Sequence, residues 1–291
     1  MTAHVHCKRG PHAHVGRIVL ARANAGNAFT LDMVAQFREA LRELEQDDAI
    51  KVIVIEPEGA DLSRGFDAAQ AEQVLSSAIA GGRKVPSQRA RLVAMDRLWW
   101  GPDGIWQRLL HCTKVTILAA RGACREIGLY LALYADLVVA DDTAWFDNPR
   151  WRHVGVDGDI SMLVATVGLK RASELMFCGG PWRARQAVQF GLVDKVVPPG
   201  GLASAIDELA LLCASVMRDG IVTEKHVVFA SLAKMQVSAG MAAASVVGGW
   251  ASNVHFRPGE FNFLREARQH GVPAALEAAD AYFDDPSSGP A

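Results

Sequence analysis

The stretch that decides the fold class is residues 115–136, VTILAARGACREIGLYLALYAD. Its first six residues are almost all apolar, which is typical of a strand buried on both faces of a parallel sheet. A turn that contains Gly122 follows, and residues 127–135 predict a buried helix. Residues 137–140 then predict a second short strand that ends at two aspartates. An apolar strand, a helix and another apolar strand indicate right-handed crossover units of an α/β protein.

The same alternation is present on the N-terminal side of this stretch. Thr30 is a good N-cap for an amphipathic helix, whose apolar side chains recur at helical spacing: Val34, Phe37, Leu41 and Leu44. Residues 51–56, KVIVIE, predict another buried strand. Residues 68–108 are polar and contain several glycines, so we interpret them as a covering segment with one or two helices, with its most flexible point at residues 81–86.

The pattern changes toward the C-terminus. Residues 162–190 are mostly helical, and residues 193–197 predict a short strand that Pro198 and Pro199 terminate. From Leu202 onward only helical periodicity remains. We therefore predict a core over residues 1–201 and a C-terminal helical subdomain over residues 202–291.

The composition limits the class of protein. The chain carries 30 basic and 32 acidic residues, a net charge of −2, and 50% apolar residues. This balance excludes disorder and coiled coil and favours neither nucleic acid nor an anionic membrane as a partner. The five cysteines have no CxxC spacing, and the sequence has no apolar run of roughly 20 residues. We expect a cytoplasmic protein without a membrane segment.

The N-terminus contains four histidines and a cysteine within eleven residues, His4, His6, Cys7, His12 and His14. Imidazole and thiolate groups are good ligands for zinc or nickel. The preferred interpretation is a hairpin that turns at residues 9–11, with its polar side chains facing outward. We predict no metal site.

Four stretches together resemble the crotonase superfamily of enoyl-CoA hydratases and isomerases. They are residues 18–28 (IVLARANAGNA), 63–67 (SRGFD), 115–136, and the pair 169–175 (LKRASEL) with 191–197 (GLVDKVV). The resemblance runs over about residues 17–198, and the last stretch is its most specific part. It implies a ClpP/crotonase spiral of ββα units, with C-terminal helices that assemble a homotrimer or a dimer of trimers.

The resemblance also implies an activity and a site. Members bind an acyl-CoA, so CoA enters as part of the substrate and no other cofactor is expected. Two backbone N–H groups form an oxyanion hole for the thioester oxygen, and by motif position they belong to Phe66 and Ile127. Arg22 and Arg64 match positions suited to the CoA phosphates, although both are equally compatible with a solvated surface. A further basic stretch, Arg83, Lys84, Arg89 and Arg91, has the same two interpretations.

The chain departs from the superfamily pattern at three positions. Ile127 stands where a turn of three glycines normally lets the ligand approach. Tyr130 and Arg150 occupy the positions of the two hydratase glutamates, so the two-glutamate hydration mechanism is not expected. The alternative to an enzyme is a binding or structural protein that kept the fold and lost catalysis.

Other side chains can supply the missing acid and base. Trp151 and Asp159 have the spacing of a tryptophan and a nucleophilic aspartate in 4-chlorobenzoyl-CoA dehalogenases, which this segment resembles. Asp159 is therefore the first candidate for nucleophile or base, and Asp157 is the second. Either aspartate could instead cap the helix that follows. Tyr130 and His153 are candidates for hydrogen bonding or proton transfer, and Glu126 is the remaining acid at the turn. Aromatic residues of this region weakly favour a cyclic or aromatic acyl group, namely Phe66, Trp99, Trp100 and Trp151.

Overall fold

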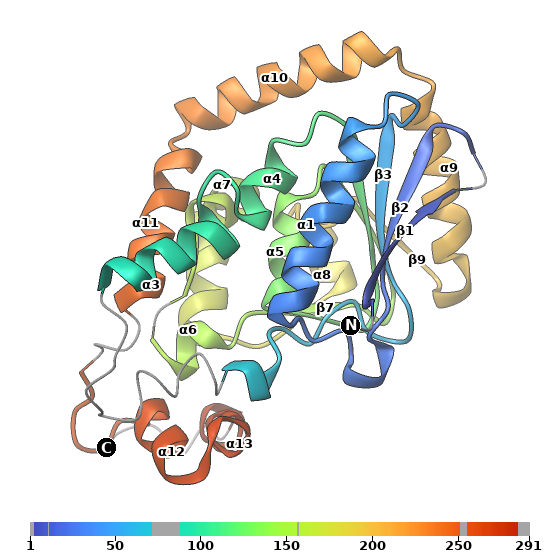
Figure 1. Cartoon of the computed structure of the whole chain (residues 1–291). Coiled ribbons are helices and arrows are strands. Elements are labelled where there is room, and N and C mark those ends of the chain that lie inside the picture. Colours follow the sequence, from blue (N-terminus) through green and yellow to red (C-terminus); the bar gives the residue numbers. More distant parts are fainter. Residues whose placement is uncertain (1–2, 11, 72–87, 156, 251–254, 285–291) are drawn as a thin grey trace.

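A computed structural model describes residues 3–10, 12–71, 88–155, 157–250 and 255–284 (Figure 1). Its centre is a six-stranded sheet in the order β1-β2-β3-β4-β6-β9. The first pair is antiparallel and all the other pairs are parallel. The strands are β1 (Val5–Arg9), β2 (Val15–Leu20), β3 (Val52–Pro57), β4 (Val115–Ala120), β6 (Leu137–Asp141) and β9 (Lys195–Val197). The predicted α/β class is confirmed, because each predicted strand lies in this sheet.

Helices cover both faces of the sheet (Figure 1). Alternate residues of a strand point to opposite faces, so Val52 and Val54 pack with α9 (Leu202–Ala214) in one apolar cluster. Ile53 and Ile55 belong to the larger cluster on the other face. That face is covered by α1 (Leu31–Gln46), α4 (Ile105–Leu110) and α5 (Ile127–Tyr134). Burial on both faces explains why these strands are apolar throughout.

The first helix begins where the sequence indicates. The Thr30 hydroxyl accepts a hydrogen bond from the Met33 N–H group at 3.1 Å, which is the contact of an N-cap. Met33, Val34, Phe37, Leu41 and Leu44 are buried along one side of α1. The predicted amphipathic helix is confirmed.

A second, three-stranded sheet carries the elements that lead into the candidate site. Its order is β5 (Ala123–Arg125), β7 (Trp145–Asp147) and β8 (Trp182–Arg183). Strand β5 runs directly into α5, and β7 runs within three residues into α6 (Arg150–His153). Because β5 and β7 are parallel neighbours, both helices start at the same edge of this sheet.

The remaining helices pack around this core. They are α3 (Gln88–Met95), the wide turn η2 (Asp96–Trp100), α7 (Ser161–Ser173), η3 (Glu174–Cys178), α8 (Ala184–Gln189), α10 (Arg218–Lys234), α11 (Val237–Trp250), α12 (Phe263–His270) and α13 (Val272–Asp284). Helices α12 and α13 share a small apolar cluster of their own. Helix α9 packs on the central sheet, whereas α10 extends away from it (Figure 1). The division at residues 201 and 202 stays a prediction.

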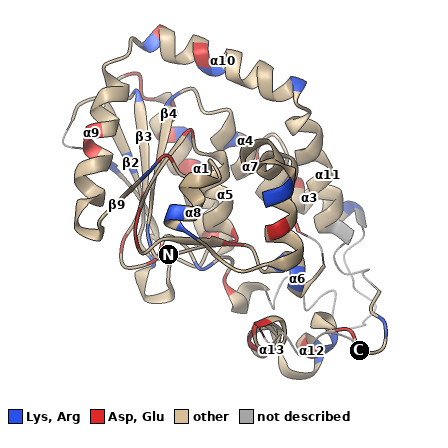
Figure 2. Cartoon of the chain, turned by 180° about the vertical axis from the view of Figure 1, so that it is seen from behind, with Lys and Arg blue, Asp and Glu red and all other residues tan. Residues whose placement is uncertain are grey.

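Charge and hydropathy add little that is distinctive. Both basic and acidic residues occur along α10 (Figure 2). In the part of the chain that the structure describes, no single helix is long and apolar enough to cross a membrane; α9 with α10 reaches that length but is bent by 98°. Of the basic stretch singled out above, Arg83 and Lys84 lie outside the described residues, as does the flexible point at residues 81–86.

Candidate active site

The loop at residues 63–66 lies beside β5 because the two segments exchange backbone hydrogen bonds. The Ser63 N–H group donates to the Ala123 carbonyl at 2.9 Å, and the Arg125 N–H group donates to the Ser63 carbonyl at 2.9 Å. The Ser63 hydroxyl accepts from the Gly65 N–H group at 3.1 Å and so holds the turn that follows. Phe66 is thereby brought next to Glu126, the residue between β5 and α5.

The Phe66 N–H group donates to a carboxylate of the protein itself. Its acceptor is Glu126 Oε2 at 3.1 Å, while Arg150 Nη1 donates to Glu126 Oε1 at 2.9 Å. Glu126 has φ 51° and ψ −97°, a conformation that is costly for a residue with a side chain. The first predicted donor is thus directed at an anionic oxygen, and the oxygen that it holds belongs to Glu126.

The second predicted donor, Ile127, is the first residue of α5. Its side chain is 2% exposed and packs in the main apolar core. Its role as an oxyanion donor stays a prediction.

Asp157 lies at the centre of the polar contacts around this point. Its Oδ2 accepts from Asn148 Nδ2 at 2.6 Å and from the Tyr130 hydroxyl at 3.2 Å, and its Oδ1 lies 3.3 Å from Arg150 Nε. The Trp151 indole N–H group donates to the Asp157 carbonyl at 3.2 Å. We name the set Glu126, Tyr130, Asn148, Arg150 and Asp157 the Arg150 cluster.

The surroundings of the Arg150 cluster shift the pKa values of its ionisable groups. Burial raises the pKa of Asp157 above its ordinary value and the nearby Glu126 carboxylate adds to the rise, although Arg150 opposes both. Burial and the Asp157 charge raise the pKa of Tyr130, so its hydroxyl stays protonated and acts as a donor. Burial lowers the pKa of Arg150, but the carboxylates of Asp157 and Glu126 outweigh burial and raise it, so the guanidinium stays charged.

Asp159, the first candidate from the sequence, makes the contacts of a helix cap. It is 1% exposed. Its carboxylate accepts from the Tyr134 hydroxyl at 2.6 Å, from the N–H groups of Ser161 and Met162, and from the Ser161 hydroxyl. These bonds satisfy the start of α7. Asp159 is therefore held outside the Arg150 cluster, whereas the second candidate, Asp157, lies inside it.

A second charged group lies next to the first and holds the C-terminal helix. His153 Nε2 is 3.1 Å from Asp280 Oδ1 of α13, and Arg125 Nη2 donates to the same oxygen at 2.8 Å. Arg125 Nε also lies 3.5 Å from Asp147 Oδ1. We name Arg125, Asp147, His153 and Asp280 the Asp147 cluster. His153 also stacks on Phe263 and Phe283, so it contacts α12 and α13 rather than Tyr130 or Asp157.

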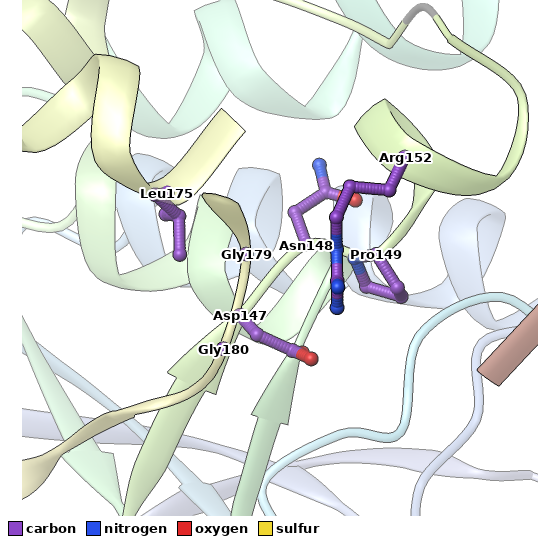
Figure 3. A pocket seen from close by; sticks show the side chains of 7 residues that line it. All are labelled: Asp147, Asn148, Pro149, Arg152, Leu175, Gly179 and Gly180. Atoms are coloured by element: carbon purple, nitrogen blue, oxygen red, sulfur yellow. The ribbon is translucent and has the colours of Figure 1, made fainter. Parts of the chain in front are cut away.

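A small hollow opens beside the Asp147 cluster (Figure 3). Asp147, Asn148 and Pro149 form one wall, and Arg152, Leu175, Gly179 and Gly180 complete it. None of the site residues predicted from the sequence is among these described lining residues. The hollow is therefore not the position at which Phe66 and Asp157 would meet a substrate.

The two arginines predicted for the CoA phosphates have protein partners. Arg22 Nη2 lies 2.8 Å from Asp67 Oδ2, and its Nη1 donates to the Ala28 carbonyl at 2.7 Å. Arg64 Nε donates to Asp61 Oδ2 at 2.7 Å, yet its side chain is 66% exposed. Arg64 can thus reach a ligand at little cost, whereas Arg22 stabilises its own turn.

Aromatic rings pack beside the Arg150 cluster. The rings of Phe66 and Trp99 meet edge to face at 5.9 Å. Those of Trp100 and Tyr130 do so at 5.1 Å, and Trp106 packs against Tyr130 at 5.3 Å. Among the described residues, no group of three His, Cys, Asp or Glu side chains is placed to hold a metal ion.

The family model of enoyl-CoA hydratase/isomerase matches residues 10–270. The chain belongs to the enoyl-CoA hydratase/isomerase family. The predicted crotonase resemblance and the assignment to an enzyme family are both confirmed. A 4-chlorobenzoyl coenzyme A dehalogenase of an Arthrobacter species is 30% identical over 199 residues, which are 67% of each chain. A probable enoyl-CoA hydratase of Mycobacterium bovis is 27% identical over 241 residues, 80% of each chain.

Solved structures of enoyl-CoA hydratases show the same fold. An enoyl-CoA hydratase from Mycobacterium smegmatis superposes with a TM-score of 0.81 at 23% identity, over 97% of this chain and 95% of that one. An enoyl-CoA hydratase/isomerase from Xanthobacter autotrophicus Py2 gives 0.78 at 24% identity, over 97% and 98%. The predicted crotonase fold is therefore confirmed.

Reasoning from the sequence missed two members of the Arg150 cluster of this family member. Arg150 was treated only as a lost glutamate, and Asn148 was not considered. An arginine that replaces an acid inside a site needs carboxylate partners, so Arg150 was itself a signal that acids from other segments converge on it. Glu126 and Asp157 are those acids.

Proposed function

We propose that this protein is an acyl-CoA enzyme in which the Phe66 N–H group binds the thioester oxygen and Asp157 transfers a proton. Proton transfer beside a thioester is common to hydration, isomerisation, carbon–carbon cleavage and hydrolysis. The observation that carries the proposal is that Arg150 contacts both Asp157 and the carboxylate on the Phe66 N–H group. An oxygen bound at Phe66 is thus one side chain away from a candidate acid or base.

The chemistry of Asp157 suits this role. A carboxylate whose pKa is raised by burial is a stronger base and holds its proton nearer neutral pH. The Tyr130 hydroxyl and the Asn148 amide fix its orientation through hydrogen bonds to one oxygen. The other oxygen faces Arg150. The proposal therefore keeps an aspartate-centred mechanism and moves it from Asp159 to Asp157.

The aromatic side chains support a cyclic or aromatic acyl group. Phe66 and Trp99 are partly buried and pack against the main core, so their exposed edges offer apolar surface next to the Phe66 N–H group. Trp100 and Trp151 are buried in the same apolar core. A ring on the acyl group would gain contact area here that a short aliphatic chain lacks.

The test is a pair of isosteric substitutions with a panel of thioesters that includes crotonyl-, cyclohexenecarbonyl- and benzoyl-CoA. Asp157→Asn is expected to lower kcat about 10²- to 10⁴-fold on the best substrate, the usual contribution of a positioned acid or base. Thioester affinity should stay within about threefold. Asp159→Asn is the matched control. It is expected to lower the melting temperature and to leave kcat largely unchanged. Loss of turnover in Asp159→Asn alone would contradict the proposal.

A second candidate function is a non-catalytic acyl-CoA binding protein of the same fold. The observation that favours it is the Glu126 carboxylate on the Phe66 N–H group, because an anion there repels a developing oxyanion. Calorimetry separates the two functions. Tight thioester binding without turnover of any panel member would support the binding protein, whereas the absence of any thioester binding would exclude both.

We also propose that the protein is a cytoplasmic homotrimer or a dimer of trimers. Large apolar side chains stay exposed at the end of α9 and along α10, including Leu212 at 68%, Met217 at 72% and Val227 at 55%. Exposed apolar area of this kind is typical of a subunit interface. Light scattering at several concentrations measures the mass, and a monomer at all of them would contradict the proposal.

A further inference from the structure

The Glu126 carboxylate bridges two donors that would otherwise be free for a ligand. One oxygen accepts from the Phe66 N–H group at 3.1 Å and the other accepts from Arg150 Nη1 at 2.9 Å. Arg150 is 38% exposed at its side chain, while its Nε is buried and lies 3.3 Å from Asp157 Oδ1. The two donors thus define neighbouring positions for two oxygen atoms.

The protein backbone is shaped around the first of these positions. Gly65 has φ 99°, and a Cβ atom at Gly65 would lie 2.5 Å from Glu126 Oε2. Glu126 itself holds a positive φ of 51°. The oxygen beside the Phe66 N–H group is therefore closely enclosed, and only a displacement of the Glu126 side chain makes this position available to a substrate.

We propose that the acyl group of the substrate carries a carboxylate on the carbon next to the thioester carbonyl, as in a malonyl thioester. After the Glu126 side chain has moved away, the thioester oxygen accepts from the Phe66 N–H group and an oxygen of the substrate carboxylate accepts from Arg150. A ring, where the acyl group has one, lies on another substituent of the same carbon. This inference rests on the proposed binding of acyl-CoA at Phe66.

Charge balance separates this substrate class from neutral acyl groups. Arg150 contacts two carboxylates, Glu126 and Asp157. A neutral acyl group that displaces Glu126 leaves the guanidinium with Asp157 alone and replaces a charge-assisted hydrogen bond at Phe66 by a neutral one, which is roughly half as strong. A substrate carboxylate restores the second negative charge on Arg150. Neutral thioesters are therefore expected to compete poorly with Glu126.

The experiment compares malonyl-CoA with butyryl-CoA, a neutral acyl group of similar size, on the full-length protein. Binding is followed by isothermal titration calorimetry, and chromatography of the recovered ligand shows whether it was converted. Malonyl-CoA is expected to bind at least tenfold more tightly than butyryl-CoA. In Arg150→Gln the two dissociation constants should agree within about twofold. Arg152→Gln, an arginine of the same helix outside the Arg150 cluster, should retain the preference.

The outcomes distinguish this inference from the proposed function. If neither thioester binds more tightly than free CoA, the proposed function fails. If butyryl-CoA binds as well as malonyl-CoA to the wild type, or the preference persists in Arg150→Gln, only the inference fails. Glu126→Gln serves where Arg150→Gln does not fold. It weakens the internal competitor, so both thioesters should bind more tightly with the tenfold ratio retained, and a lost ratio would overturn the inference.

Discussion

Each of two clusters of charged side chains includes a residue of α6, and the two clusters differ in role although both combine arginine with carboxylates. The Arg150 cluster combines a partly exposed arginine with two carboxylates and a backbone N–H donor. The Asp147 cluster combines Arg125 with two aspartates and a histidine that is 1% exposed at its side chain. In the proposed function the first cluster offers its donors to a ligand, whereas the second connects α13 to the core. Adjacent residues therefore have different roles: Arg125 attaches α13 to the core, and Glu126 lies at the proposed ligand-binding position.

The largest change in stability is expected from a substitution that breaks the Asp147 cluster. Arg125→Met leaves Asp147 and Asp280 without their shared guanidinium, so the free energy of unfolding should fall by about 2 to 3 kcal/mol, less than for a fully buried ion pair because Arg125 is 28% and Asp280 41% exposed. Urea denaturation measures this change. Thioester affinity should not change, because the Arg150 cluster keeps its contacts.

The matched control is Arg185→Met, which removes an arginine that is 80% exposed and paired with Asp142. An exposed pair contributes less than about 1 kcal/mol, so this variant should unfold much as the wild type does. If Arg125→Met abolished thioester binding and left stability unchanged, the separation of the two clusters would be wrong.

A smaller effect is a pH dependence that belongs to the Asp147 cluster. Burial raises the pKa of Asp147 from 3.8 to about 6. The folded state therefore binds its proton more tightly than the unfolded state, so this stabilisation is complete below pH 3.8 and is lost as the pH rises through 6. Relative to Asp147→Asn, the wild type should lose about 2 kcal/mol of unfolding free energy between about pH 4.5 and 7.

Urea denaturation of both proteins at the two pH values measures this difference. Parallel behaviour of wild type and Asp147→Asn would show that Asp147 is ionised throughout, and the cluster would then be a simple salt bridge. A pH dependence of this sign would show that Asp147, a titrating group, takes part in the connection between α13 and the core.

The smallest effect concerns the Arg150 cluster. Glu126→Gly and Glu126→Ala both remove the carboxylate, but only glycine accepts φ 51° and ψ −97° without steric cost. The glycine variant should therefore be more stable than the alanine variant by about 1 kcal/mol. Thermal unfolding of the two variants measures the difference. Equal stability would indicate that the backbone at residue 126 relaxes to an ordinary conformation once the carboxylate is removed. The contacts of the Arg150 cluster would then not impose this turn.

The sequence was sufficient for most of the fold. The strands at residues 51–56, 115–120 and 137–140 and the helix after Thr30 lie where their apolar patterns placed them, because burial on one or two faces determines those patterns. That Phe66 lies beside the turn at Glu126 also follows from the order of the motifs. In contrast, the sequence favoured Asp159 over Asp157, and the spacing could not show which of the two contacts Arg150 because both aspartates precede the same helix.

The family, the layered α/β architecture and the segments that supply the site follow from the order of residues along the chain. Three features depend on the folded chain: which acids contact Arg150, that Glu126 accepts from the Phe66 N–H group, and that His153 pairs with Asp280 of α13. The reason is the distance along the chain over which each interaction acts. Apolar periodicity reports burial within one segment, whereas a charge is satisfied by whichever partner the fold brings within about 3 Å, and that partner is 127 residues away for His153 and 60 for Phe66.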